Sequence, residues 1–232
     1  MTIQCFSQSE LATTNDPNGY TNVRNGKGFD SKVIDRFNYG DLFLCEPTSE
    51  EWWLISMFDR TQGYIHKSRI TIIKNLSDLE IKKVIFLGLD TFNTKCIVFI
   101  NSVNSGDFNL YSIKREEVEN YHSTIYMSLF KFIVQQFCKS GDTELLQKFL
   151  ETIVINQGSA DEMQPVTLAK CYACKPELTI KQIDKFSEED RKILANFLSF
   201  GFDNYALVYE KSIPNLKYLK DLLEKWIKGA KL

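Results

Sequence analysis

The hydrophobic period of the chain changes partway along its length, and this change limits the folds open to it. Between Asn15 and Ile70, turn signals recur about every ten residues, at NDPNG, NGKG, NYGD, PTSEE and DRTQG. From Tyr121 onward, apolar residues recur at helical spacing instead. Short segments bounded by turns indicate antiparallel strands, and a 3.6-residue period indicates helices. The sequence therefore predicts an α+β fold, with β structure in the N-terminal part and helices in the C-terminal part.

The segments between these turn signals are short and rich in β-branched and aromatic residues, which favours strands. They lie at Lys32–Phe37, Leu42–Cys45, Trp52–Phe58 and Gly63–His66. Gly40 and Gly63 each precede a polar or aromatic residue, and we expect both in tight turns that need positive φ. Trp52 and Trp53 are adjacent on one expected strand, so their side chains should point to opposite faces.

This N-terminal segment resembles the bacterial SH3-like domains over about a quarter of the chain, within residues 15–70. The match runs through Gly19-Tyr20-Thr21-Asn22-Val23-Arg24, Gly26, Gly28, Lys32-Val33-Ile34, Gly40-Asp41, Trp52-Trp53-Leu54-Ile55, and Gly63-Tyr64-Ile65-His66 with Ser68 and Ile70. The resemblance implies an SH3-like β-barrel. It also implies that such a domain binds peptidoglycan stem peptides when exported and acts as a protein-interaction module when it is not. Tyr64 stands where many members carry Trp, which changes the shape of any aromatic groove there.

The middle of the chain, from Thr71 to Glu119, is interpreted as a short helix followed by a hairpin. Ser77 is a plausible N-cap with Glu80 three residues on, whereas KCIVFINSV and FNLYSI look extended on either side of the turn NSGD. The chain is thus expected to divide into a barrel at 1–73, a connecting α+β segment at 74–120 and a helical domain at 121–232, which resembles no family.

The C-terminal part predicts helices separated by caps and glycines. One ends at Gly141, a second runs from the cap Asp142 to Gly158, and about four more follow. Ser187, with Asp190 three residues on, is expected to cap one of these. The last helix has one apolar face, made by Leu216, Leu219, Leu222, Leu223 and Trp226.

Charge and apolar runs limit the partners and the compartment. The net charge is −2 and the isoelectric point is about 5.8, which gives no general attraction to nucleic acid or to anionic lipid. The N-terminus lacks the basic start and apolar run of a secretory signal, so we expect a cytoplasmic protein. The longest apolar runs, Val84–Leu89 and Cys96–Ile100, are far shorter than the roughly 20 residues that span a bilayer. Neither nucleic acid nor a membrane is therefore an expected partner.

The cysteines offer the spacing nearest to a metal or redox site. There are six, and without an export signal we expect them to be reduced. Cys171 and Cys174 stand three apart, but the two histidines and the other cysteines supply no second ligand pair, so no metal and no cofactor are expected. No serine or cysteine lies in a nucleophile pattern with a histidine, so the chain is interpreted as not an enzyme. An enzyme using Cys171 or Cys174 stays an alternative that would need an accessible thiolate of low pKa.

The best candidate for recognition is an aromatic set with polar neighbours in the SH3-like segment. It comprises Tyr20, Trp52, Trp53 and Tyr64, flanked by Asn22, Arg24 and Asp41. Rigid amphipathic rings make good interface anchors, although a small barrel would bury some of them. We expect a non-catalytic protein-binding protein, in its narrower form an immunity protein or antitoxin that neutralises a bacterial toxin or effector. A peptidoglycan-binding or processing protein whose signal lies outside the sequence is the alternative.

Overall fold

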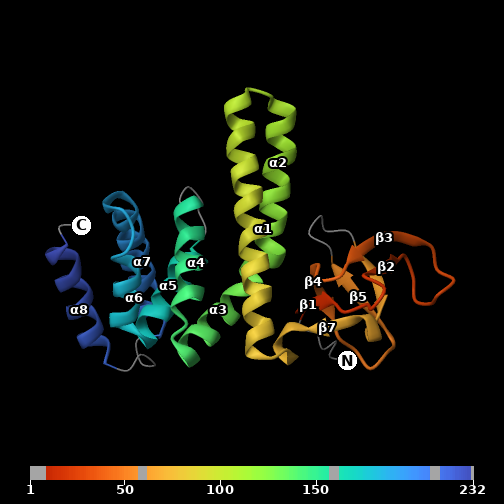
Figure 1. The fold of residues 1–232 in the computed structure, drawn as a ribbon, viewed down its shortest axis with the longest axis horizontal. Helices are drawn as coiled ribbons and strands as arrows, with labels where there is room; N and C mark the ends of the chain where they lie inside the picture. The colour runs from red at the N-terminus through yellow and green to blue at the C-terminus, as the bar shows by residue number, and fades with distance from the viewer. Residues whose placement is uncertain (1–8, 57–61, 157–161, 210–214, 231–232) are drawn as a thin grey trace, which may run out of the picture. The chain divides into compact units, whose positions relative to one another are not determined.

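The computed structural model describes residues 9–56, 62–156, 162–209 and 215–230, and its elements follow the expected order of strands, then helices (Figure 1). The strands are β1 Glu10–Thr14, β2 Tyr20–Arg24, β3 Val33–Asn38, β4 Leu42–Glu46, β5 Trp52–Ser56, β6 Gln62–His66 and β7 Ile70–Ile72. They form one antiparallel sheet in the order β3-β2-β6-β5-β4-β1-β7. The sheet is not closed. The α+β class predicted from the sequence is therefore confirmed, and a strand lies in each of the four segments expected between residues 32 and 66.

The sheet has an apolar face because buried residues recur at every second position along β2, β4 and β6. The buried cluster comprises Ala12, Val23, Phe37, Phe43, Cys45, Ile55, Ile65 and Ile70. Phe37 and Phe43 stack in it with ring centroids 4.9 Å apart. Strand β1, which precedes the first turn signal, was not expected, and it pairs with both β4 and β7.

The two glycines singled out in the sequence have different roles. Gly40 has φ +88° in the turn between β3 and β4, as expected. Gly63 lies within β6, so the expectation of a turn there is wrong. A Cβ at this position would lie 2.4 Å from Cγ1 of Val23 and 3.0 Å from the carbonyl oxygen of Arg24. Glycine is needed at 63 because β2 approaches β6 closely, and not because of a turn.

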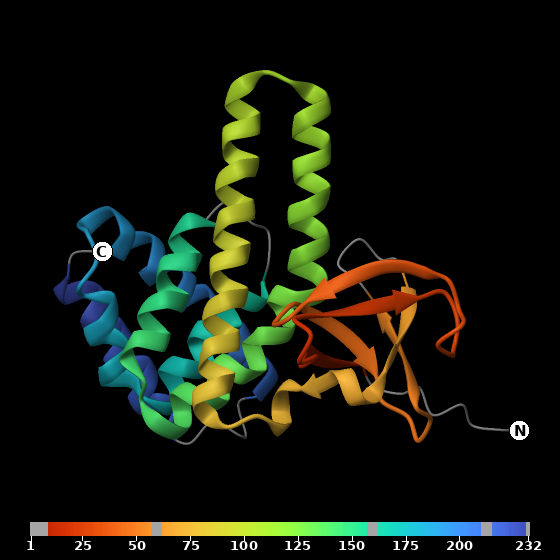
Figure 2. The same ribbon diagram turned by 45° about the vertical axis from the view of Figure 1, so that its right-hand side comes forward.

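The region read as a helix and a β-hairpin is a pair of long helices instead (Figure 2). Helix α1 spans Asp78–Ser105 and begins with the expected capping box, in which Ser77 and Glu80 each accept from the other's backbone N–H. Helix α2 spans Phe108–Tyr121 and runs back along α1. Both segments expected as strands lie inside these helices. The expected turn NSGD is present, but its Gly106, at φ +73°, ends α1 and its Asp107 caps α2.

Helix α1 is both long and strongly apolar. The two apolar runs noted in the sequence fall on this single helix of 28 residues. In the described part of the chain it is the one helix long and apolar enough to cross a membrane, and about a third of its most apolar stretch is buried. The core helix of a soluble protein can be equally long and apolar.

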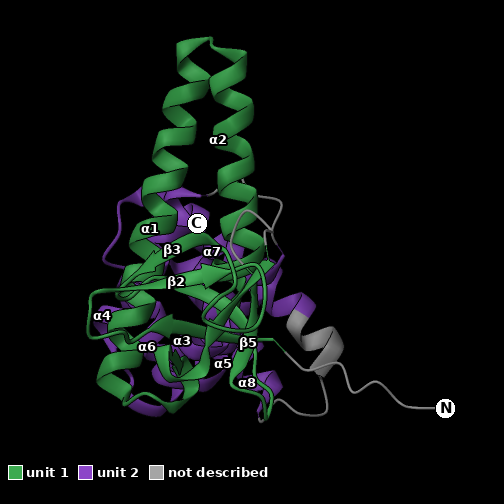
Figure 3. Cartoon of the chain, turned by 90° about the vertical axis from the view of Figure 1, so that its right-hand side faces the viewer, with its two compact units in different colours: residues 1–128 green, residues 129–232 purple. Residues whose placement is uncertain are grey.

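The chain separates into two compact units, residues 1–128 and 129–232 (Figure 3). The sheet, the α1–α2 hairpin and a π-helical turn at His122–Tyr126 belong to the first. Helix α3, Met127–Ser140, leads into the second. The further helices of the second unit are α4 Thr143–Ile155, α5 Met163–Cys174, α6 Pro176–Ile183, α7 Glu188–Tyr209 and α8 Leu216–Gly229.

The caps expected in the second unit are present. Asp142 accepts from the backbone N–H groups of Glu144 and Leu145 at the start of α4, and the Ser187 hydroxyl accepts from the N–H of Asp190. Leu219 and Leu223 on the apolar face of α8 are buried. Residue Gly158, the expected end of the second helix, lies outside the described residues.

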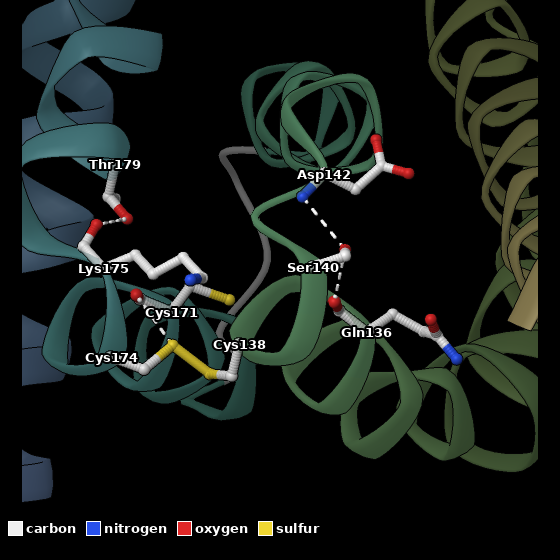
Figure 4. Close-up of a disulfide and its surroundings, with 8 residues drawn as sticks. All are labelled: Gln136, Cys138, Ser140, Asp142, Cys171, Cys174, Lys175 and Thr179. Carbon is white, nitrogen blue, oxygen red and sulfur yellow. Dashed lines mark hydrogen bonds between the residues drawn. A yellow bond between two sulfur atoms is a disulfide. The ribbon is translucent and has the colours of Figure 1, made fainter.

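One cysteine pair departs from the expectation of reduced thiols. Cys138 on α3 and Cys174 at the end of α5 form a disulfide across 36 residues of sequence (Figure 4). The two positions are far apart in sequence, and sequence spacing alone does not show that helix packing brings them together. Cys45, Cys96 and Cys171 are buried and belong to no disulfide, and Cys5 lies outside the described residues.

Candidate functional site

A groove on the N-terminal sheet is the strongest candidate for a binding site. It is a hollow of about 200 Å³ that opens over β2, β5 and the end of β6, within the first compact unit. The side chains that line it are Asp16, Asn18, Tyr20, Thr21, Asn22, Arg24, Phe29, Trp52, His66 and Arg69. One part of this lining is aromatic and the other is polar and charged.

The aromatic part is a cluster of three rings from separate segments. Phe29 in the β2–β3 loop contacts Trp52 on β5 edge-to-face, with centroids 5.0 Å apart, and His66 at the end of β6, at 5.7 Å. Trp52 and His66 are 5.4 Å apart. A hydrogen bond between His66 Nδ1 and the Ser68 hydroxyl, 2.8 Å long, restrains the His66 ring. Phe29 is 71% exposed, so most of its surface is free to contact a ligand.

A buried carboxylate anchors the polar part. Asp16 is 5% exposed, and its Oδ1 accepts from Nη1 of Arg69 at 3.2 Å and from the N–H of Asn18 at 3.0 Å. Two of the groove's polar side chains are thereby fixed in place. Asp16 and Arg69 carry opposite charges, so together they add no net charge to the groove.

Asn22 and Arg24, neighbours but one on β2, present further hydrogen-bonding groups. Nη1 of Arg24 donates to the carbonyl oxygen of Ser31 at 2.7 Å, which ties the β2–β3 loop to the strand. The Oδ1 atom of Asn22 is buried and accepts no hydrogen bond from any described residue. An unpaired buried acceptor is unfavourable in the folded protein.

Tyr20 lies at the mouth of the groove and is 39% exposed. The guanidinium of Arg36, on the neighbouring strand β3, lies over its ring at 4.2 Å from the centroid. This cation–π contact restrains the ring while leaving part of it open to solvent.

The structure brings together four of the residues named from the sequence, Tyr20, Asn22, Arg24 and Trp52. Trp53 points the other way, as expected for alternate residues of a strand, and packs on the apolar core. Its Nε1 donates to the carbonyl oxygens of Thr48 and Glu50, at 3.1 and 3.2 Å.

Tyr64 and Asp41 do not line the groove. Tyr64 is half-buried on β6, and the Lys27 ammonium lies 5.8 Å from its ring centroid. The Asp41 carboxylate accepts from the N–H of Asn38 in the β3–β4 turn, at 2.7 Å. Asp41 also lines a second hollow of the same unit, of about 300 Å³, together with Leu87 and Tyr121.

Several lining residues were missed by the sequence interpretation. Phe29 lies in NGKGFD, where an aromatic residue in a glycine-rich turn is a usable sign of an exposed ring. His66 was assigned only to the strand end. Asp16 and Arg69 are 53 residues apart, and no sequence pattern indicates that they pair.

The cysteine pair Cys171 and Cys174 and the second histidine, His122, do not line the groove. Burial raises the pKa of the Cys171 thiol to about 12, and Cys174 is in the disulfide, so neither offers the thiolate that a catalytic role would need. His122 packs against Phe92 and Tyr126, with centroids 5.8 and 5.5 Å away. In the part of the chain that the structure describes, no group of three or more His, Cys, Asp or Glu side chains could hold a metal ion.

No family model matches the chain, and no curated protein matches its sequence.

Proposed function

We propose that this chain is a non-catalytic protein-binding protein, and that its N-terminal sheet is an SH3-like domain whose groove binds an extended segment of a protein partner. Support for the domain comes from the residues that resemble the bacterial SH3-like pattern and from the antiparallel order of the short strands. Support for binding comes from the groove, where exposed rings lie beside fixed polar groups.

The observation that carries the proposal is that the aromatic rings of Phe29 and Trp52 line the same groove as the polar side chains of Asn22 and Arg24. An extended peptide presents backbone N–H and C=O groups at regular intervals, and these can hydrogen-bond to the polar side chains of the groove. Side chains of the peptide would then pack on the aromatic cluster. Arg24 and Arg69 favour a segment that also carries a carbonyl or carboxylate group.

The narrower form of the proposal concerns the partner. A small, mildly acidic binding protein without a nucleophile constellation in its sequence suits a cytoplasmic immunity protein or antitoxin, whose partner is a bacterial toxin or effector. Such a protein acts by covering its partner, so it needs no cofactor of its own.

Affinity purification from the native host with matched variants tests the proposal. The tagged chain should recover a partner at stoichiometric yield, and the Trp52→Ala variant should lose it, because the aromatic cluster is removed. Tyr39→Ala is the control, since Tyr39, in the turn after β3, is 69% exposed but does not line the groove. Equal recovery with both variants would exclude the groove as the binding surface.

The disulfide favours a second candidate, an exported protein whose groove binds cell-wall peptides. Disulfides persist mainly in oxidising compartments outside the cytoplasm. This candidate predicts that the chain co-sediments with purified peptidoglycan and that Trp52→Ala abolishes the co-sedimentation. If the chain stays in solution while a protein partner is recovered, the first candidate holds and this one fails.

A further inference from the structure

The tip of the α1–α2 hairpin has an unusual concentration of exposed apolar side chains. Between residues 96 and 113 the sole charged residue is Asp107, which caps α2. Phe108, at the first position of α2, is 85% exposed, Ile113 is 56% exposed and Val103 is 50% exposed. Ile97 and Ile100 on α1 are 48% and 45% exposed. Soluble monomers seldom expose a cluster of this kind unless it is covered by a partner or a lipid surface.

These side chains are not needed for the hairpin's own packing. Between the helices, Phe99 contacts Tyr111 with centroids 5.5 Å apart, and Ser102 is buried and donates to the carbonyl oxygen of Phe99. Each of these exposed apolar side chains keeps 45% or more of its surface accessible beside this seam. At the end of the hairpin, Val103, Phe108 and Tyr111 border a shallow hollow of about 160 Å³.

Beyond the tip, the first charged side chains along both helices are basic. The first charged residues of α2 below the tip are Lys114 and Arg115, and the first on α1 is Lys95. Lys114 pairs with Glu117 and Arg115 with Glu119, so each acid lies about one helical turn farther from the tip than its base. The positive ends of these pairs are nearest to the tip, and this order complements an anionic surface on which the tip would rest.

The length of the uncharged segment matches shallow insertion. Residues 108–113 of α2 rise about 9 Å along the helix axis at 1.5 Å per residue. Interfacial helices bury their apolar groups about 5–10 Å into the boundary between headgroups and acyl chains. A complete span is disfavoured, because α2 carries five charged residues between 114 and 119 and runs beside α1.

We propose that the tip of the α1–α2 hairpin, residues 97–113, inserts into the headgroup and upper acyl region of an anionic lipid bilayer. Phe108 and Val103 enter the acyl boundary, and Ile113, Lys114 and Arg115 lie at the level of the lipid headgroups. The chain's net charge of −2 gives no general attraction to such a surface, so this local arrangement carries the binding.

Vesicle flotation tests the proposal with two charge substitutions of equal size. The wild-type chain should float with vesicles of phosphatidylcholine and phosphatidylglycerol, and float less with phosphatidylcholine alone. Phe108→Asp should reduce the bound fraction about tenfold, because a charge replaces the deepest apolar group. The substitution is compatible with folding, since residue 108 is exposed and an acid is favourable at the first turn of a helix. Leu79→Asp is the control. Leu79 is 64% exposed and lies in the first turn of α1, at the end of the hairpin away from the tip.

Insertion depth provides a second readout. Phe108→Trp should show a blue-shifted emission with these vesicles and added quenching by brominated acyl chains, relative to the wild-type chain with its three tryptophans. Absence of wild-type flotation, or flotation that Phe108→Asp leaves unchanged, would overturn the proposal. A smaller mass for Phe108→Asp than for the wild-type chain, measured by light scattering without lipid, would also overturn it. The tip of the wild-type chain would then contact a second copy.

Discussion

At the scale of single residues, Trp52 and Trp53 are adjacent but have separate roles. Trp53 packs on the apolar core, and its indole N–H donates to two carbonyl oxygens, whereas Trp52 lies among the exposed rings of the groove. We expect Trp53→Ala to lower the free energy of unfolding by about 3 kcal/mol and Trp52→Ala to lower it by less than about 1 kcal/mol. Urea denaturation followed by circular dichroism measures both. An equal loss for the two variants would mean that Trp52 also belongs to the core.

The sequence predicted the groove in part, and the reason differs from residue to residue. Tyr20, Asn22, Arg24 and Trp52 could be named because each belongs to a strand of the SH3-like pattern and alternation places them on one face. The pairing of Asp16 with Arg69 depends on how the β1–β2 loop meets the turn after β6, and this contact between distant segments leaves no local pattern.

At the scale of elements, the crossing of α5 and α7 depends on Gly201. A Cβ at this position would lie 2.0 Å from the carbonyl oxygen of Pro165, so the helices would have to separate. Gly201→Ala should lower the free energy of unfolding by about 2 kcal/mol or more. Gly229→Ala in α8 is the matched control, since no atom lies within 4 Å of its added Cβ, and it should be neutral or slightly stabilising. Chemical denaturation of the two variants checks this, and equal stability would contradict the close crossing.

The docking of α8 should depend on pH through Glu177 and Tyr218. The Tyr218 hydroxyl donates to Glu177 Oε1, which lowers the pKa of Glu177 and raises the pKa of Tyr218. The lowered carboxyl pKa stabilises the fold above the unfolded value of about 4.3, and this contribution is lost as the pH falls through the folded pKa. The raised tyrosine pKa stabilises it below about pH 10, and this is lost as the pH rises through the folded pKa.

Hydrogen exchange of the α8 amides measures this dependence. Tyr218→Phe should reduce their protection relative to the wild-type chain near neutral pH. As the pH falls through the lowered pKa of Glu177 and its carboxylate becomes protonated, the difference between the two chains should shrink. A difference that is constant from acid to neutral pH would show that the hydroxyl acts without the carboxylate.

The sequence predicted the strands better than the long helices, for a physical reason. Strands between regular turn signals have few alternatives, because glycine and proline interrupt any helix there. The runs at 95–103 and 108–113 are short and apolar, and such runs do not separate a strand from a segment of buried or partnered helix. Helix α1 continues through the first run because its capping box begins the helix many residues earlier, at Ser77.

At the scale of the whole molecule, the disulfide should set the stability of the second unit. In the chain-entropy model, closing 36 residues between Cys138 and Cys174 contributes about 4 kcal/mol. Adding a dithiol reductant should lower the unfolding midpoint of the wild-type chain to that of the Cys138→Ser/Cys174→Ser double variant and leave the variant unchanged. If the reductant changes neither protein, the two cysteines are not joined in solution.

The central claim is that the groove around Trp52 contacts a protein partner, and site-specific photo-crosslinking tests it most directly. A photoreactive phenylalanine analogue would replace Tyr20, which lines the groove, or Tyr39, which is exposed in the β3–β4 turn and does not line it. After irradiation in the native host, the chain with the analogue at 20 should form an adduct with one partner. The adduct should disappear when Trp52→Ala is added, and the chain with the analogue at 39 should form none. An equal adduct from both positions, or none from position 20, would contradict the claim.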